Sequence, residues 1–329
     1  MNPTLGQAHV DTALTQISIA FKLAATMFKA GIAFPRVPVK KQSDKILEMN
    51  RSDWLRNEAG IRAAATESRG GGFRISATKT YFADVHAYHV DVPATMIANS
   101  DIENIEVQMA EFVMQKLLLE RELDWVTKFF AINKWADQGT PNDATGSGAS
   151  NTWPYFRYWD DHANGNPMKA VRNGRQAVKK TTGFNPNLMF VGEEVHDELA
   201  MHPDVMEVIK YTQIGIADVA LLARLFRVDR YLIGEAVYDA GLEGATTATY
   251  SFAFGKHVLL CYVPAVAGLL TPSAGYIFEW TGFNNMGYDV KMKTIDAPLL
   301  EAERIEGEMA YDARQICSEL GVFYNGAIS

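Results

Sequence analysis

The segment from Asp101 to about Trp135 constrains the fold more than any other part of the chain. Ser100 and Glu103 form a capping box in front of it, and neither Gly nor Pro interrupts it. A helix over this range would be about 50 Å long, whereas helices in globular proteins average about 11–12 residues. The segment therefore predicts a structural spine. Its apolar residues recur at the spacings of one helix face: Ile105, Met109, Phe112, Leu119, Leu123, Val126 and Phe130.

Composition limits the classes of protein that such a spine can belong to. The chain has 329 residues, enough for about two domains, and 48% of them are hydrophobic. It has no run of 18 uncharged apolar residues, so a membrane-spanning protein is excluded. Thirty-one Lys and Arg against 39 Asp and Glu give a net charge of −8, which argues against a surface that coats nucleic acid. Two cysteines, Cys261 and Cys317, are too few for a disulfide-stapled module and fit a reducing compartment.

The N-terminal region is apolar and resembles a signal peptide only superficially. Between Ile17 and Phe34, Ser18, Lys22 and Lys29 recur on one helix face, whereas a signal peptide has a lysine-free apolar core. We therefore predict an amphipathic arm helix. Packing against protein is favoured over lying on a membrane, because two lysines make a thin basic face.

The next region predicts a long β-hairpin with a glycine-rich segment near its start. A short helix over 53–67 is followed by Gly70-Gly71-Gly72, which breaks regular structure. Two extended runs follow, over 73–80 and 81–92, and we expect them to pair with each other. Because an isolated two-stranded ribbon is marginal in water, we expect it to lie on something else.

The rest of the chain alternates between helices and strands. Residues 137–151 are rich in Gly, Ser, Thr and Asn and predict a flexible loop, and 301–320 is a mixed segment without a clear period. The predicted helices are 167–181, 193–202, 204–211 and 217–226, and the predicted strands are 187–191, 230–238, 249–254, 257–263, 276–280, 288–293 and 322–328.

Catalytic and metal-binding motifs are mostly absent. No phosphate-binding loop, dinucleotide fingerprint, zinc-protease motif or nucleophile elbow is present. His86 and His89 would point to opposite faces of a strand and so could not share an ion. His196 lies beside Glu193 and Glu194, but acidic residues at a helix start are explained by the helix dipole. We predict no catalytic residues, no cofactor and no metal site.

Arginines around the triple glycine form the one local basic cluster. Arg62, Arg69 and Arg74 surround Gly70–Gly72 and could contact an acidic protein surface or a polynucleotide. The net charge of −8 favours the protein partner. These six residues are the predicted contacts between subunits: Arg62, Arg69, Gly70, Gly71, Gly72 and Arg74.

The order of these elements resembles that of the major capsid proteins of tailed phages, which have the Hong Kong 97-type fold. The resemblance covers nearly the whole chain and includes the run from Phe184 to Gly192 followed by Asp197-Glu198-Leu199 and His202-Pro203. It implies an α+β fold with five parts: an N-terminal arm (1–50), an E-loop β-hairpin (51–98), a peripheral domain with its spine helix (99–183), an axial domain (184–283) and a return to the peripheral domain (284–329).

The resemblance also implies a function. Such a chain would assemble through homo-pentamers and homo-hexamers into an icosahedral shell, in the host cytoplasm, as part of the virion. The shell would enclose double-stranded DNA without sequence-specific binding, with scaffold, portal and decoration proteins as further partners and no membrane. No long scaffolding prefix is present, which implies a separate scaffold or none.

Two alternatives stay open from the sequence. The first is an encapsulin-like compartment shell that stores a cargo protein, although no pocket for a cargo peptide can be identified in the sequence. The second is a soluble metal-dependent enzyme that uses the region of His196, Glu193 and Glu194.

Overall fold

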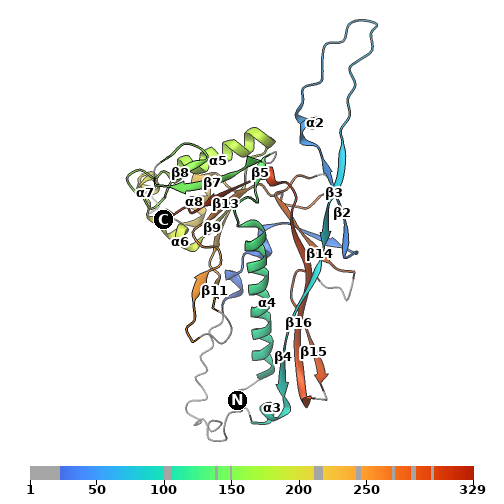
Figure 1. The fold of residues 1–329 in the computed structure, drawn as a ribbon, viewed down its shortest axis with the longest axis vertical. Helices are drawn as coiled ribbons and strands as arrows, with labels where there is room; N and C mark the ends of the chain where they lie inside the picture. Colours follow the sequence, from blue (N-terminus) through green and yellow to red (C-terminus); the bar gives the residue numbers. More distant parts are fainter. Residues whose placement is uncertain are drawn as a thin grey trace.

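A computed structural model describes residues 23–99, 105–137, 140–148, 150–210, 218–241, 246–268, 271–282, 287–297 and 300–329. Figure 1 shows a lobe of strands and helices, a long helix with a second sheet beside it, and a hairpin that projects away from both. The helices are α1 (Ala30–Ala33), α2 (Arg51–Leu55), α3 (Ala94–Asn99), α4 (Ile105–Phe129), α5 (Pro167–Thr182), α6 (Glu193–Met201), α7 (Pro203–Lys210) and α8 (Val219–Phe226), with 3-10 turns η2 (Ala25–Met27) and η4 (Ser318–Leu320).

A six-stranded sheet forms the centre of the first lobe. Its order is β10-β9-β13-β17-β7-β8, and two of its inner strands, β9 and β13, are fully buried apolar runs, as a sheet covered on both faces requires. One face packs against α5, α6, α7 and α8, and the other faces α4 and α1. The strands are β7 (Asp143–Ser147), β8 (Tyr155–Arg157), β9 (Leu188–Gly192), β10 (Arg230–Gly234), β13 (Val258–Cys261) and β17 (Gly321–Asn325).

A five-stranded sheet lies beside α4 and is organised around its longest strand, β16. This strand pairs antiparallel with β4, β14 and β15, and β1 joins β14 in parallel. Gly307 in β16 lets α4 approach closely, because a Cβ there would lie 2.6 Å from Leu117 Cδ1. The strands are β1 (Arg36–Val39), β4 (Asp84–Pro93), β14 (Gly275–Trp280), β15 (Lys291–Ala297) and β16 (Ala302–Gln315).

Three two-stranded ribbons complete the fold. They pair β2 with β3, β5 with β6 and β11 with β12. Their strands are β2 (Ser43–Met49), β3 (Ile75–Phe82), β5 (Ala136–Asp137), β6 (Thr140–Pro141), β11 (Val237–Asp239) and β12 (Tyr250–Phe252). None of the helices in the described residues is long and apolar enough to cross a membrane.

The predicted spine helix is confirmed as α4, but its end and its buried face differ from the prediction. It ends at Phe129, where Trp135 folds back and its indole Nε1 donates to the Phe129 carbonyl at 2.9 Å. The buried residues are Ile105, Val113, Leu117, Leu118, Arg121, Glu122, Trp125 and Phe129, whereas Phe112 is exposed. The buried face includes the charged residues Arg121 and Glu122, so the pattern of apolar residues does not indicate this face. The predicted capping box at Ser100 and Glu103 lies outside the described residues.

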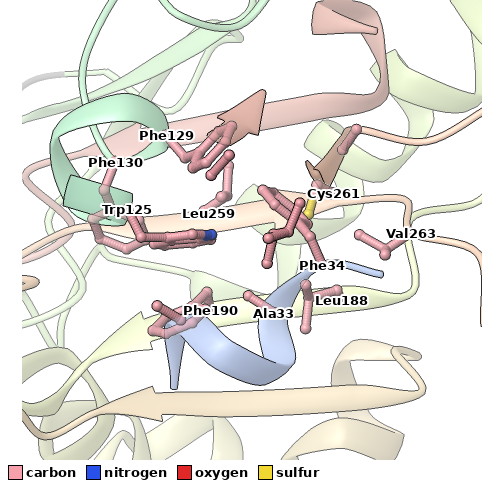
Figure 2. Packing of buried hydrophobic residues seen from close by; sticks show 14 of the residues in the cluster. Ala33, Phe34, Trp125, Phe129, Phe130, Leu188, Phe190, Leu259, Cys261 and Val263 are labelled. Atoms are coloured by element: carbon pink, nitrogen blue, oxygen red, sulfur yellow. The ribbon is translucent and has the colours of Figure 1, made fainter. Parts of the chain in front are cut away.

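An aromatic cluster joins α4 to the six-stranded sheet. Figure 2 shows Trp125 near both Phe34 and Phe190. The ring centroids of Trp125 and Phe190 are 4.9 Å apart, and those of Trp125 and Phe34 are 5.5 Å apart. The same cluster contains Ile277 of β14 and Tyr311 of β16, so one core connects both sheets.

The predicted arm helix over 17–34 is wrong in its described part, and residues 17–22 lie outside the described residues. Phe28 is extended between η2 and α1, which places its ring against Leu118. Glu122 accepts hydrogen bonds from the backbone N–H groups of Lys29 and Ala30 at 2.9 and 2.8 Å. At the other end of α1, Arg230 donates to two backbone carbonyls. Two side chains that are distant in sequence, Glu122 and Arg230, therefore hold the two ends of this short helix by hydrogen bonds.

Strand pairing overturns the expected partner of the run over 81–92. That run forms β4 and pairs with β16, whereas β3 pairs with β2, which lies inside the range assigned to the arm. The predicted loop over 137–151 is also wrong in part, since it contains β7, and the mixed segment over 301–320 contains β16. The helix predicted over 53–67 is only the short α2.

The two sheets do not divide the chain at the predicted boundaries. The six-stranded sheet takes β7 and β8 from 99–183 and β17 from 284–329, and β14 within 184–283 belongs to the five-stranded sheet. Strands distant in sequence become neighbours here, and a pattern read along the chain cannot identify such partners.

Candidate intersubunit surface

The β2–β3 hairpin is the part of the molecule that projects furthest from both sheets (Figure 1). Its pairing runs from Ser43 opposite Phe82 to Met49 opposite Ile75, with an irregularity between Ile46 and Glu48. Residues 50–74 connect the two strands, and we call this segment the hairpin tip. Every residue from 54 to 76 is exposed.

The base of the hairpin is fixed to the five-stranded sheet. The Tyr81 ring stacks on Phe278 with a centroid distance of 4.5 Å. The backbone N–H of Phe82 donates to Asp312 Oδ2 at 2.9 Å. Lys79 forms an ion pair with Glu48 at 2.6 Å and also donates to the Ile316 carbonyl. The hairpin therefore leaves the body in a defined direction.

A second set of contacts closes the tip where it begins. Asp53 accepts three hydrogen bonds from Arg74, one from its backbone N–H and two from its guanidinium, at 3.0 to 3.1 Å. These bonds lower the pKa of Asp53, whose side chain is only 7% exposed. Asn50 caps α2 by accepting from the Ser52 backbone N–H at 3.0 Å. The Asp53–Arg74 bonds thus hold the two ends of the tip together, and we call this closed part of the hairpin the neck.

The other predicted contact residues lie beyond this neck and do not share one partner. Arg62 donates to the Thr66 carbonyl, and the Arg69 guanidinium lies against Gly60. Gly70 and Gly72 have open space where a Cβ would stand, and at Gly71 a Cβ would meet only the end of the Glu58 side chain. All three glycines lack positive φ. The triple glycine is therefore a flexible and narrow stretch of chain.

The hairpin exposes apolar side chains as well as arginines. Trp54 is 63% exposed and contacts Phe73, with 5.6 Å between the ring centroids. Exposed apolar side chains that gather on one element mark a protein contact surface. The large exposed hydrophobics of the hairpin are Leu47, Trp54, Leu55, Ile61, Phe73, Ile75 and Phe82.

A groove of about 1550 Å³ lies between the hairpin and the body. Its walls come from β2, α2 and β3 on one side and from β14, Phe184 and residues 316–320 on the other. The sequence pattern does not indicate this groove, because it does not indicate β2. The irregularity between Ile46 and Glu48 breaks the period of two by which a strand is recognised.

The residues considered as metal ligands have other contacts. His196 Nδ1 lies 3.1 Å from the Tyr231 hydroxyl, and burial lowers its pKa. His86 stacks on Tyr311. In the part of the chain that the structure describes, no three His, Cys, Asp or Glu residues are placed to hold a metal ion. Cys261 is fully buried, and burial raises its pKa to about 12.

Comparison with known proteins gives one match in sequence. No family model matches the chain. Over 125 residues the chain is 31% identical to the major capsid protein of Burkholderia phage BcepMu, a match that covers 36% of this chain. It spans 39% of that relative's length.

Comparison of structures gives matches over nearly the whole chain. A phage-related protein from Bordetella bronchiseptica has a TM-score of 0.67 and 16% identity, with 97% of each chain covered. The capsid of cyanophage P-SCSP1u has a TM-score of 0.58 and 11% identity, with 100% of this chain and 96% of that chain covered. A virus-like particle from Pyrococcus furiosus has a TM-score of 0.50 and 13% identity, with 89% and 90% covered. These likenesses confirm the fold predicted from the sequence.

Proposed function

Because the chain has the Hong Kong 97-type fold of tailed-phage capsid proteins, we propose that it is the major capsid protein of a tailed double-stranded DNA phage. It assembles through pentamers and hexamers into an icosahedral shell around the genome. Its role is structural, without catalytic residues or cofactor, and its place is the virion, after assembly in the host cytoplasm. The partial match to the major capsid protein of Burkholderia phage BcepMu supports this proposal.

The observation that carries the proposal is the exposed hairpin. Its apolar side chains have too few neighbours in their own chain to be buried, yet its base and neck are held firmly. A ribbon of this kind gains stability when it lies across another protein surface. In a shell, that surface is an adjacent copy, which the tip contacts through Arg62, Arg69, Gly70–Gly72 and Arg74.

The domain roles follow the same proposal. The first lobe, built on the six-stranded sheet, acts as the axial domain, and α4 with the five-stranded sheet acts as the peripheral domain. Scaffold, portal and decoration proteins are further partners. The packaged DNA is enclosed without sequence-specific contacts.

The cellular compartment remains the alternative for a chain with this fold. The likeness to the virus-like particle from Pyrococcus furiosus supports a related shell, at a lower TM-score than the phage capsid. The contents of particles purified from the native source separate the two. Packaged DNA supports the capsid, and a co-purified cargo protein supports the compartment.

The first test is electron microscopy with light scattering on the protein expressed alone and with its neighbouring phage genes. Closed particles, or rings of five and six, are expected. A chain that stays monomeric in both settings would contradict the proposal.

Charge reversal in the hairpin tip is expected to impair assembly while leaving folding nearly unchanged. Arg69→Glu alters an exposed side chain beyond the neck, so we expect its free energy of unfolding to change by about 1 kcal/mol or less. Arg74→Glu also removes the bonds to Asp53, so its particle yield is compared only after thermal unfolding has shown that the variant folds. Alanine at Gly70, Gly71 and Gly72 meets no backbone obstacle in the described residues and should also fold. We expect each variant to lower particle yield about tenfold, measured by sedimentation.

The matched control is Lys134→Glu, which makes the same change of charge at an exposed residue outside the hairpin. It should assemble as the wild type does. Normal particle yield from the Arg69 and Arg74 variants would show that the tip is not an intersubunit contact.

A further inference from the structure

One face of α5 carries a concentration of positive charge that its own chain does not neutralise. The helix has five basic and no acidic residues; four of the basic residues are exposed and Arg175 is half-buried. None of the five side chains forms an ion pair or hydrogen bond with a described residue. We call this surface the basic rim: Lys169, Arg172, Arg175, Lys179 and Lys180.

The helix dipole explains only part of this charge. Lys179 and Lys180 lie in the last turn, where cations are favourable, but Arg172 and Arg175 lie further from the C-terminus. Burial and the positive charge of Arg227, just beyond α8, lower the pKa of Arg175. The neighbouring charge is thus repulsive. Positive charges that repel each other within the single chain indicate a binding partner of negative charge.

The same lobe has the opposite arrangement on α6. Glu193, Glu194 and Asp197 lie in its first two turns, and Glu235 follows β10. Burial raises the pKa of Glu193, and the charges of Asp197 and Glu235 raise it further, whereas the charge of Lys29 opposes the rise. We call these four residues the acidic rim.

The helices that carry the two rims lie on opposite edges of the lobe. Figure 1 is viewed along the shortest axis of the molecule, and in it α5 lies at the upper edge of the lobe and α6 at the lower edge. The β2–β3 hairpin projects upward, toward the same side as α5. Edges of a flat molecule are the surfaces through which copies meet side by side.

We propose that the basic rim of one copy binds the acidic rim of the next copy around the axis of each pentamer and hexamer. This inference rests on the proposed function and adds the chemistry of the axial contact. A head-to-tail contact that closes into a ring needs two different and complementary surfaces on each subunit, which these rims provide. Complementary charge also fixes the orientation in which copies add to the ring. The hairpin then reaches across the same neighbour that the basic rim contacts.

The test uses full-length protein and paired charge reversals. In Lys179→Glu/Lys180→Glu the basic rim loses two positive charges and gains two negative ones, and in Glu194→Lys/Asp197→Lys the acidic rim changes in the opposite sense. Each double variant is expected to lower the yield of rings and particles about tenfold, and combining all four changes should restore most of it. Sedimentation and negative-stain microscopy measure yield, and thermal unfolding checks that each variant folds.

The control is Lys40→Glu/Lys134→Glu, two exposed lysines outside both rims with the same total change of charge. It should assemble as the wild type does. Assembly of Lys179→Glu/Lys180→Glu at wild-type yield would overturn the proposal, and so would a quadruple variant that restores nothing. If that double variant instead assembles normally but loses affinity for a 40-base-pair DNA duplex, the basic rim binds nucleic acid and not a second copy. Failure of the wild type to assemble would count against the proposed function itself.

Discussion

Replacing Trp125 by alanine is expected to lower the free energy of unfolding by about 4 kcal/mol. Trp125 is fully buried, and its ring lies within 5.5 Å, centroid to centroid, of the rings of Phe34, Phe129 and Phe190. Truncation removes this apolar contact and leaves a cavity where α1, α4 and the six-stranded sheet meet. Urea denaturation followed by far-UV circular dichroism measures the change.

A matched control comes from the other end of the molecule. Trp54 in α2 is 63% exposed, so Trp54→Ala should change the free energy of unfolding by about 0.5 kcal/mol or less. Because Trp125 Nε1 has no hydrogen-bond partner among the described residues, Trp125→Phe should cost much less than Trp125→Ala and serves where the alanine variant does not fold. Equal destabilisation by Trp54→Ala and Trp125→Ala would contradict this account of the core.

Local sequence patterns predict individual elements of this fold better than they predict which faces of those elements are buried. Elements whose pattern is local were predicted well: α5 ends at Thr182, just before Gly183 with its positive φ, and β9 is a continuous apolar run between polar segments. The spine helix was recognised by length, but its buried face was not. Arg121 and Glu122 occupy that face and pair with backbone groups of Tyr288, Lys29 and Ala30, which are distant in sequence.

The exposure of the candidate surface could be predicted from the sequence, but the strands that carry it could not. The basic and glycine-rich composition indicated an exposed contact segment, and residues 54–76 are exposed. Which strands carry it could not be predicted, because β4 pairs with β16 across more than 200 residues and β2 has an irregular register. Nor did composition reveal that Arg74 binds Asp53, since ion pairs across a loop follow from its path in space.

Glu122→Gln is expected to change how stability depends on pH. Burial raises the pKa of Glu122 from 4.5 to about 7, although hydrogen bonds from Ala30 and Lys29 and the charge of Arg121 oppose the rise. Between pH 4.5 and about pH 7, the Glu122 carboxyl group is therefore protonated in the folded state but ionised in the unfolded state. The stabilisation is fully present below pH 4.5 and is lost as the pH rises through 7. A shift of this size corresponds to about 3 kcal/mol.

The measurement compares the free energy of unfolding of Glu122→Gln and the wild type between pH 5 and pH 8. Glutamine carries no charge at either pH, so the variant lacks this proton uptake. Its stability relative to the wild type should therefore rise with pH, by up to about 3 kcal/mol, whatever the constant cost of altering the hydrogen bonds to Lys29 and Ala30. Glu106→Gln makes the same replacement at an exposed position on the same helix and serves as the control. A constant difference for Glu122→Gln would mean that the carboxyl group has an ordinary pKa, and that the contact between α4 and the start of α1 is insensitive to pH.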